Sequence, residues 1–378
     1  MVMSGGTSGG TSGGTSGGTS GGTSGGTSGG TSGGTSGLVR RNSLAHAESP
    51  ASPLLSTALL TTRDGVTGYW NLEKTPTSPE SAFFESGIAY LDQLTLNGQA
   101  AVIESLLASR TVVKVADPDP HALKVELCIG DKPLTSIERP DALYFAKDLN
   151  WVRAYADLRA DRLAEIHMQL DDLLSFFGAQ IYLDSYRRRY TIMVLDLARR
   201  LAQHIQAQMK YLCRTKRPID FAPEVQPMIQ TPYHSSFPSG HAMEAFAMAT
   251  TLHRLTSDTS LKKAVAEDAL PFVLAHRIAV NRTVAGVHFP VDSWVGAWVG
   301  CRVGDAFYSM AQGKEINVAN LPKPTVETDE ETKDFILNDF KAELGHNSIS
   351  LDPLEELKHV WCLALKEWGR DCDNDGAV

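Results

Sequence analysis

The segment 237–255 reads FPSGHAMEAFAMATTLHRL, and this stretch decides the fold. Its Pro-Ser-Gly start is typical of a helix N-terminus, because Ser239 at the cap position can accept a hydrogen bond from a free backbone N–H. The apolar run that follows predicts the helix itself. The free N–H groups at the start of a helix form an anion site. Gly240 has no side chain, so the backbone can approach an anion closely there, and the His241 side chain is expected to reach the same site from the first turn. An ordinary capped helix with a surface histidine has the same pattern.

A second segment lies upstream and reads KYLCRTKRP from Lys210 to Pro218. Seven residues separate Lys210 from Arg217 along the chain, about two helical turns, so both side chains are predicted to project from one helix face toward one ligand. Two cations held close together are costly unless an anion neutralises them. The alternative is a basic helix terminus that the helix dipole and solvent stabilise.

A third segment lies downstream and reads RTVAGVHFPVD from Arg282 to Asp292. Arg282 offers a planar fork for two oxygens of a phosphate-like group. Pro290 suits the first turn of a helix, which places Asp292 to accept a hydrogen bond from one ring nitrogen of His288. The other ring nitrogen is then left for a ligand. A helix-start aspartate beside a core histidine is the alternative.

The sequence from residue 150 onward predicts a mainly α-helical body, because apolar residues recur there at helical spacing. Helices are expected over 150–177, 182–213, 240–256, 261–281 and 290–311, with a further pair near 330–343 and 352–368. Asp184 is a candidate cap for the second of these, and Pro271 predicts that 261–281 is two helices. Upstream, residues 112–115 and 123–127 alternate well enough to be short strands.

The N-terminus is a repeat, with eight copies of Ser-Gly-Gly-Thr between Ser4 and Thr35. Such a sequence cannot bury apolar surface, so it predicts a disordered tether. We therefore expect four parts: a disordered repeat (1–37), a mixed N-terminal region (38–148), a catalytic helical domain (149–312) and a C-terminal helical extension packed on the same body (313–378).

Composition excludes several classes of partner. The 378-residue chain has a formal net charge of −9, whereas nucleic acid or an anionic membrane requires a basic face. The sequence contains no run of about 18 apolar residues, so it predicts no transmembrane helix, and a soluble protein is expected. The cysteines, Cys128, Cys213, Cys301, Cys362 and Cys372, are scattered and odd in number, which favours buried free thiols over disulfides or a zinc site. Reduced thiols favour the cytoplasm, and a secreted or periplasmic location stays open if a signal has been removed.

The ordered set K-x6-R-P, P-S-G-H and R-x5-H-x3-D resembles the shared signature of type 2 phosphatidic acid phosphatases, bacterial non-specific acid phosphatases and vanadium-dependent haloperoxidases. The resemblance covers 210–292 by motif and about 150–311 by helical character. It implies a helical-bundle core and makes a homodimer reasonable. It also implies that an oxyanion is held by the residues at the matching positions, which are Lys210, Arg217, Ser239, Gly240 and Arg282.

The same resemblance implies roles for three further residues. His288 matches the residue that attacks phosphorus in the phosphatases or ligates vanadium in the haloperoxidases. Asp292 would fix its tautomer, and His241 matches the general acid. Vanadate bound to a histidine mimics phosphorus during phosphoryl transfer, so the motifs alone do not separate the two activities.

His234 favours one of these activities. A histidine seven residues before His241 resembles bromoperoxidases, so the first hypothesis is a bromo- or iodoperoxidase-like enzyme that uses His288-ligated vanadate, hydrogen peroxide, a halide and a small organic substrate. A loop histidine without a catalytic role is the alternative. The short spacings from Arg217 to Ser239 and from His241 to Arg282 favour the second hypothesis, a soluble acid phosphatase that acts through a phosphohistidine.

Two further classes stay open. The first is a non-enzymatic phosphate-binding protein, although every expected motif residue is present. The second is a serine hydrolase using Ser239, His288 and Asp292, which would leave the clustered cations unexplained.

Overall fold

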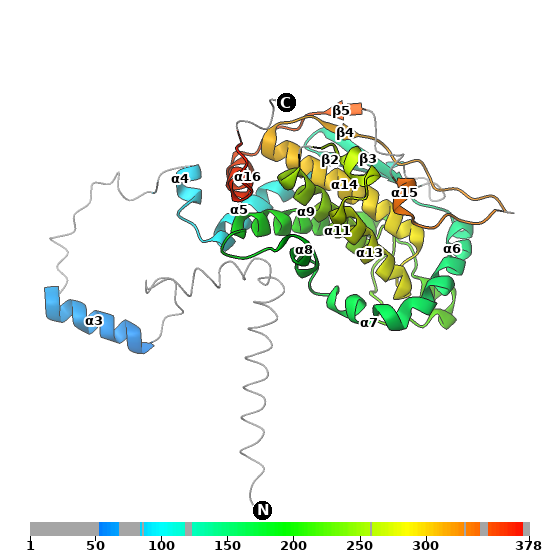
Figure 1. Ribbon diagram of the computed structural model, residues 1–378, viewed down its shortest axis with the longest axis horizontal. Helices are drawn as coiled ribbons and strands as arrows, with labels where there is room; N and C mark the ends of the chain where they lie inside the picture. The colour runs from blue at the N-terminus through cyan, green and yellow to red at the C-terminus, as the bar shows by residue number, and fades with distance from the viewer. Residues whose placement is uncertain are drawn as a thin grey trace, which may run out of the picture. The chain divides into compact units, whose positions relative to one another are not determined.

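The computed structural model describes residues 53–67, 84, 87–117, 123–257, 259–328, 330–340 and 347–372 of the chain (Figure 1). The repeat at 1–37, for which the sequence predicts disorder, lies outside the described residues. The chain divides into two compact units, Met1–Gln99 and Ala100–Val378. The expected divisions after residues 148 and 312 both fall within the second unit and stay predictions.

The described part of the first unit is helical. It contains α3 (Pro53–Thr67), α4 (Ile88–Leu91) and the start of α5 (Leu96–Ser109). Gly87 precedes α4 with a φ of 71°, a left-handed conformation that favours glycine. This region was expected to be of mixed structure, without assigned helices.

The second unit contains a three-stranded antiparallel sheet, ordered β1 (Thr111–Asp117), β2 (Lys124–Ile129) and β3 (Lys132–Glu138). β1 and β2 confirm the two predicted strands. β3 was not predicted, because Pro133 and a polar centre interrupt its apolar alternation. In the fold that centre is buried: the Thr135 hydroxyl donates to the Ala319 carbonyl at 2.7 Å and accepts from the Trp298 indole at 3.0 Å. A two-stranded sheet, β4 (Ile316–Val318) and β5 (Asn347–Ile349), lies nearer the C-terminus.

The rest of the second unit is helical, which confirms the mainly α prediction (Figure 1). The helices are α6 (Ala142–Tyr155), α7 (Arg159–Met168), α8 (Leu174–Ile181), α9 (Arg189–Cys213), α10 (Pro218–Phe221), α11 (Gly240–Thr256), α12 (Leu261–Ala266), α13 (Leu270–Val284), α14 (Pro290–Gln312), α15 (Leu337–Phe340) and α16 (Glu355–Glu367). Short 3-10 turns occupy Ala156–Leu158 and Pro223–Val225.

α11 lies at the centre of the helical core. It packs against α9, α13 and α14, and almost every residue from Ala242 to Leu255 is buried (Figure 1). Phe246 is fully buried and its ring meets those of Phe272, Phe335 and Phe340 at centroid distances of 5.5–6.3 Å. Truncating such a side chain to alanine costs about 3–5 kcal/mol in other proteins, so this cluster anchors α11.

Glycines on α14 set the distance between α11 and α14. A methyl group at Gly296 would lie 2.4 Å from the Ser239 carbonyl oxygen, and one at Gly300 would lie 2.4 Å from the Met243 carbonyl oxygen. Larger residues would therefore push α14 away from α11. Since α11 begins beside Ser239 and α14 begins beside Asp292, this close packing positions both motif segments.

Several predicted helix boundaries need correction. The stretch expected as one helix over 150–177 is divided among α6, a 3-10 turn, α7 and α8. The first of these, α6, begins earlier than expected, where the Asp141 carboxylate accepts from the Tyr144 N–H at 2.9 Å. Asp184 accepts from the Tyr186 N–H at 2.6 Å in a turn before α9, and does not cap α9 itself, which begins at Arg189. The helix near 330–343 is reduced to α15 within the described residues. The prediction of two helices around Pro271 is confirmed by α12 and α13.

The cysteine prediction was partly wrong. Cys362 in α16 and Cys372 beyond its end form a disulfide, whereas Cys128, Cys213 and Cys301 are free and buried as expected. The pair was not evident in the sequence, because only the turn after α16 brings two cysteines ten residues apart together. Among the described helices, none combines the length and apolar character needed to cross a membrane.

Candidate active site

Lys210 and Arg217 converge, although not in the way predicted. Lys210 is buried in the last turn of α9, and its Nζ donates to the backbone oxygens of Ser235 at 2.8 Å and Ser236 at 3.2 Å. α9 ends three residues later, and Arg214 follows with a left-handed φ of 50°. The expectation that both cations lie on one helix face is therefore wrong, because Arg217 lies in extended backbone before α10. Loop 234–236 brings the two cations together instead.

The Arg217 guanidinium joins the first and third segments. Its Nη1 donates to the Val287 carbonyl at 2.7 Å and lies 3.1 Å from Nε2 of His288. Its Nη2 lies 3.1 Å from Nδ1 of His234. Because a guanidinium can only donate, Nε2 of His288 presents a lone pair to Arg217.

The start of α11 confirms the predicted cap. Ser239 is the N-cap residue, and its hydroxyl accepts from the Ala242 N–H at 3.5 Å, a long contact. Its own N–H donates to the Asp292 carbonyl oxygen at 2.8 Å, which ties the second segment to the third. A methyl group at Gly240 would lie 1.7 Å from Oε1 of Gln206, so the Gln206 side chain would have to move to accommodate it.

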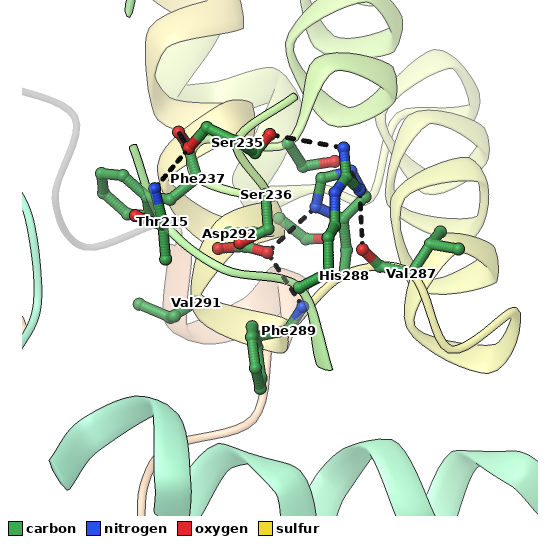
Figure 2. Close-up of polar contacts among 12 residues, drawn as sticks. Thr215, Ser235, Ser236, Phe237, Val287, His288, Phe289, Val291 and Asp292 are labelled. Carbon is green, nitrogen blue, oxygen red and sulfur yellow. Dashed lines mark hydrogen bonds and ion pairs between the residues drawn. The ribbon is translucent and has the colours of Figure 1, made fainter. Parts of the chain in front are cut away.

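His288 and Asp292 form the expected pair. Asp292 lies in the first turn of α14, which begins at Pro290 as predicted, and its Oδ2 lies 2.9 Å from Nδ1 of His288. Figure 2 shows the same oxygen also accepting the Phe289 N–H, at 3.0 Å. The carboxylate places the ring proton on Nδ1, so Nε2, beside Arg217, carries the lone pair. This is the tautomer that a nucleophile or a ligand requires.

Arg282 is buried near the C-terminal end of α13, with half of its guanidinium engaged. Nη2 donates to the Ile166 carbonyl at 3.1 Å and to Oε1 of Gln169 at 3.0 Å. Nε and Nη1 are buried without a hydrogen-bond partner among the described residues. Buried donors of a charged group are costly when left unmatched, so the N–H groups of these two nitrogens suit an anionic ligand.

Gln169 is a residue of the site that sequence reasoning missed. It is almost fully buried in the turn after α7, and its backbone oxygen lies 2.9 Å from Nε2 of His241. Its side-chain oxygen also accepts from Asn281, at 3.0 Å. Because a carbonyl only accepts, Nε2 of His241 carries the proton and Nδ1 carries the lone pair. No sequence signal marks Gln169, which lies 72 residues before His241.

Burial shifts the pKa values of the cations downward. It lowers the pKa of Lys210 to about 7, assisted by the neighbouring Arg217 charge. It lowers the pKa values of Arg217 and Arg282 to about 10. Crowded and dehydrated cations favour a bound anion, which would restore these pKa values.

The histidines are neutral for the same reason. Burial, followed by the charge of Arg282, lowers the pKa of His241 to about 3. Burial and the Arg217 and Lys210 charges lower the pKa of His288 well below its ordinary value. Burial raises the pKa of Asp292 to about 6. A neutral His288 is able to act as a nucleophile, and a bound anion would raise the pKa of His241 toward the range of a general acid.

His234 lies at the edge of the site. Its ring is exposed, contacts Arg217, and has a pKa lowered by partial burial and by the Lys210 charge. It lines an open cavity of about 920 Å³ together with Lys210 and Arg217. The structure thus brings together all nine residues that the sequence nominated, while their roles stay predictions.

Comparisons with known proteins agree with this arrangement. Residues 191–316 match the PAP2 superfamily. Two curated relatives from strains of Mycobacterium tuberculosis (CDC 1551 / Oshkosh and H37Rv), both described as decaprenylphosphoryl-5-phosphoribose phosphatase, are 33% identical over 129 residues. The chain therefore contains a PAP2 superfamily region at residues 191–316. The alignment covers 34% of this chain and 66% of each relative, slightly less than two thirds of their length.

The PAP2 region contains all three motif segments, the helices α11, α13 and α14, and α9 except for its first two residues. Gln169 lies outside it. A solved structure, the first transmembrane PAP2 type phosphatidylglycerolphosphate phosphatase from Bacillus subtilis, shares 20% identity and covers 42% of this chain and 80% of its own. Its TM-score of 0.30 is too low to carry an argument about the fold. The superfamily resemblance is thus confirmed, and the named relatives are phosphatases, not haloperoxidases.

Proposed function

We propose that this PAP2 protein hydrolyses phosphate monoesters through a phosphohistidine at His288. The observation that carries the proposal is the pairing of His288, whose Nε2 lone pair is oriented by Asp292, with the two unmatched buried nitrogens of Arg282, Nε and Nη1. A nucleophile and an unsatisfied cation in one buried site match the needs of phosphoryl transfer, in which positioning and charge stabilisation do most of the work.

The oxyanion pocket binds the phosphoryl group first. Lys210, Arg217 and Arg282 offset its charge, while the Ser239 hydroxyl and the Gly240 N–H at the start of α11 are positioned as further donors. The equatorial oxygens gain charge in the transition state, so donors already in place stabilise it without rearrangement.

Transfer then proceeds in two steps. Nε2 of His288 forms a bond to phosphorus as the bond from phosphorus to the ester oxygen breaks, and His241 delivers a proton to that oxygen, which leaves as an alcohol. Asp292 stabilises the positive charge on the His288 ring. A water molecule next attacks phosphorus and gives a proton to His241, and the N–P bond breaks to release phosphate and neutral His288.

The named relatives bear on the choice between the two hypotheses drawn from the sequence, a haloperoxidase and an acid phosphatase. Both named relatives are phosphatases, which supports the second hypothesis over a haloperoxidase. The unmatched Arg282 donors and the Nε2 lone pair of His288 also fit vanadate, which would supply peroxide activation when bound. His234, the basis of the haloperoxidase hypothesis, contacts Arg217 and lines the open cavity, a position equally suited to contacting a leaving alcohol.

Phosphate release from p-nitrophenyl phosphate tests the proposal directly. Activity should disappear in His288→Ala and persist in His204→Ala, which removes an exposed histidine of α9 outside the site. Mass spectrometry of the rapidly quenched wild-type protein should locate a phosphoryl group on His288. Bromination of a dye by the vanadate-loaded protein with peroxide, in the absence of any phosphate release, would overturn the proposal in favour of a haloperoxidase.

A further inference from the structure

The open cavity beside the oxyanion pocket is far larger than a phosphate group. We call it the outer groove; it is lined by one face of α9 from Gln203 to Tyr211, by residues 214–217, 219 and 220, and by loop 231–235. Its volume of about 920 Å³ is typical of pockets that hold a complete small-molecule ligand. Lys210 and Arg217 line both the groove and the oxyanion pocket, so the groove is positioned to hold whatever is attached to the phosphate.

The outer groove is strongly cationic. Four cations line it: Lys210, Arg214, Lys216 and Arg217. Among the described residues of the lining, Asp220 is the single carboxylate, and its Oδ2 accepts the Arg217 backbone N–H at 2.9 Å. Within the described residues none of the four cations forms an ion pair, whereas Arg254, for example, pairs with Asp305 at 2.7 Å. In a chain of net charge −9, this concentration of unpaired positive charge favours an anionic ligand.

The four cations are arranged at two depths. Lys210 and Arg217 are buried and contact the oxyanion pocket, whereas Arg214 and Lys216 are exposed at the rim. Arg214 follows Lys210 by four residues, about 6 Å along the helix axis. A phosphate that neutralises the two inner cations therefore leaves two outer cations for another part of the same substrate.

The rim also carries aromatic surface. The side chains of Tyr211 and Tyr233 line the outer groove, and these residues are 81% and 102% exposed. Exposed rings with one polar end pack well against the organic part of a ligand. The groove thus combines an inner anion site, ring faces and an outer pair of cations.

We infer that the preferred substrates are small phosphate monoesters that carry a second phosphate group, which binds Arg214 and Lys216 while the first is hydrolysed. This inference rests on the proposed function, because it assigns the substrate class of the same site. Hydrolysis breaks one phosphorus–oxygen ester bond with one water molecule, and the second phosphate stays on the released alcohol.

A matched substrate pair tests the inference. Adenosine 5′-monophosphate and adenosine 3′,5′-bisphosphate share their nucleoside and differ by one phosphate. At low ionic strength we expect kcat/KM to be about tenfold higher for the bisphosphate, mainly through KM, and we expect the preference to shrink as salt screens the outer cations. An equal kcat/KM for both substrates would overturn the inference while leaving the phosphatase proposal intact.

The double variant Arg214→Asn/Lys216→Gln should abolish the preference. Asparagine is chosen because Arg214 has a left-handed φ of 50°, which asparagine tolerates. The matched control is Lys262→Gln/Lys263→Gln, which removes the same charge from an exposed part of α12 outside the groove lining. Retention of the preference in the groove variant, or its loss in the control, would contradict the assignment.

Binding provides a readout that does not depend on turnover. Calorimetric titration of His288→Asn with the same two nucleotides should show about tenfold tighter binding of the bisphosphate, reduced by the groove substitutions. If the wild type hydrolyses neither nucleotide nor p-nitrophenyl phosphate, the proposed function fails. In that case, equal binding of the two nucleotides would also reject the assignment of the outer groove to a second phosphate. Tighter binding of the bisphosphate would support the outer groove as a binding site for a second phosphate.

Discussion

Substituting Gln169 with glutamate should separate stability from anion binding. Oε1 of Gln169 accepts from Nη2 of Arg282 at 3.0 Å and from Asn281 at 3.0 Å, and a glutamate oxygen can accept both hydrogen bonds. The side-chain shape is conserved, and Nε2 of Gln169 has no partner to lose among the described residues. We therefore expect the unfolding midpoint of Gln169→Glu to equal or exceed that of the wild type.

Anion binding should weaken for an electrostatic reason. The new carboxylate would neutralise the Arg282 guanidinium at its Nη2 edge. A phosphate bound at the opposite edge of the guanidinium would lie about 6 Å from that carboxylate. With an effective dielectric constant of about 20, one pair of unit charges at that distance repels by about 3 kcal/mol. This corresponds to an increase of roughly 100-fold in KM for p-nitrophenyl phosphate and in the inhibition constant of inorganic phosphate.

Two variants complete the experiment. Gln169→Leu removes the acceptor without adding charge, so it should lower the free energy of unfolding by about 2 kcal/mol. Gln208→Glu adds the same charge on α9 outside the groove lining and serves as the matched control. Steady-state kinetics and thermal unfolding provide the measurements. An unchanged KM and phosphate inhibition constant in Gln169→Glu would refute the assignment of Arg282 to the anion site.

Two further predictions concern proton positions. Asp292→Asn should lower kcat by about 100- to 10,000-fold in steady-state assays, because an amide can donate to Nδ1 of His288 and move the ring proton to Nε2; a change confined to KM would contradict this role. Sulfate, whose charge is constant near neutral pH, should inhibit less well as pH rises from about 6 to about 8, because a bound anion favours the charged form of Lys210 and its pKa in the free site is about 7. Sulfate inhibition of the Lys210→Gln variant, measured over the same pH range, should be weaker and nearly independent of pH. An equally steep pH dependence of sulfate inhibition in that variant would assign the effect to another group.

The local features of the site followed from the sequence. The cap at Ser239, the start of α14 at Pro290 and the pairing of His288 with Asp292 were all predicted correctly. Each depends on residues within four positions of one another, and helix geometry brings such residues together whatever the rest of the chain does. The motif order then identified the superfamily, which the comparison of residues 191–316 confirmed.

Features that depend on distant segments were missed or explained wrongly. Lys210 and Arg217 converge through loop 234–236 and not along one helix, because a left-handed residue at Arg214 ends α9. Strand β3 forms because Trp298 and Ala319 satisfy its buried Thr135, and neither partner is near it in sequence. Local periodicity carries no information about such partners.

The sequence by itself determined the helical class and the three motif segments and nominated the residues of the site, since each of these depends on residue type and short spacing. Only the tertiary structure decided that Gln169 connects His241 to Arg282, that half of the Arg282 guanidinium is left unmatched, and that an outer groove with two further cations continues from the pocket. The physical reason is that hydrogen-bond satisfaction and burial depend on every segment that surrounds a side chain. The packing of α7, α9, α11 and α13 therefore decided which donors were left for a ligand.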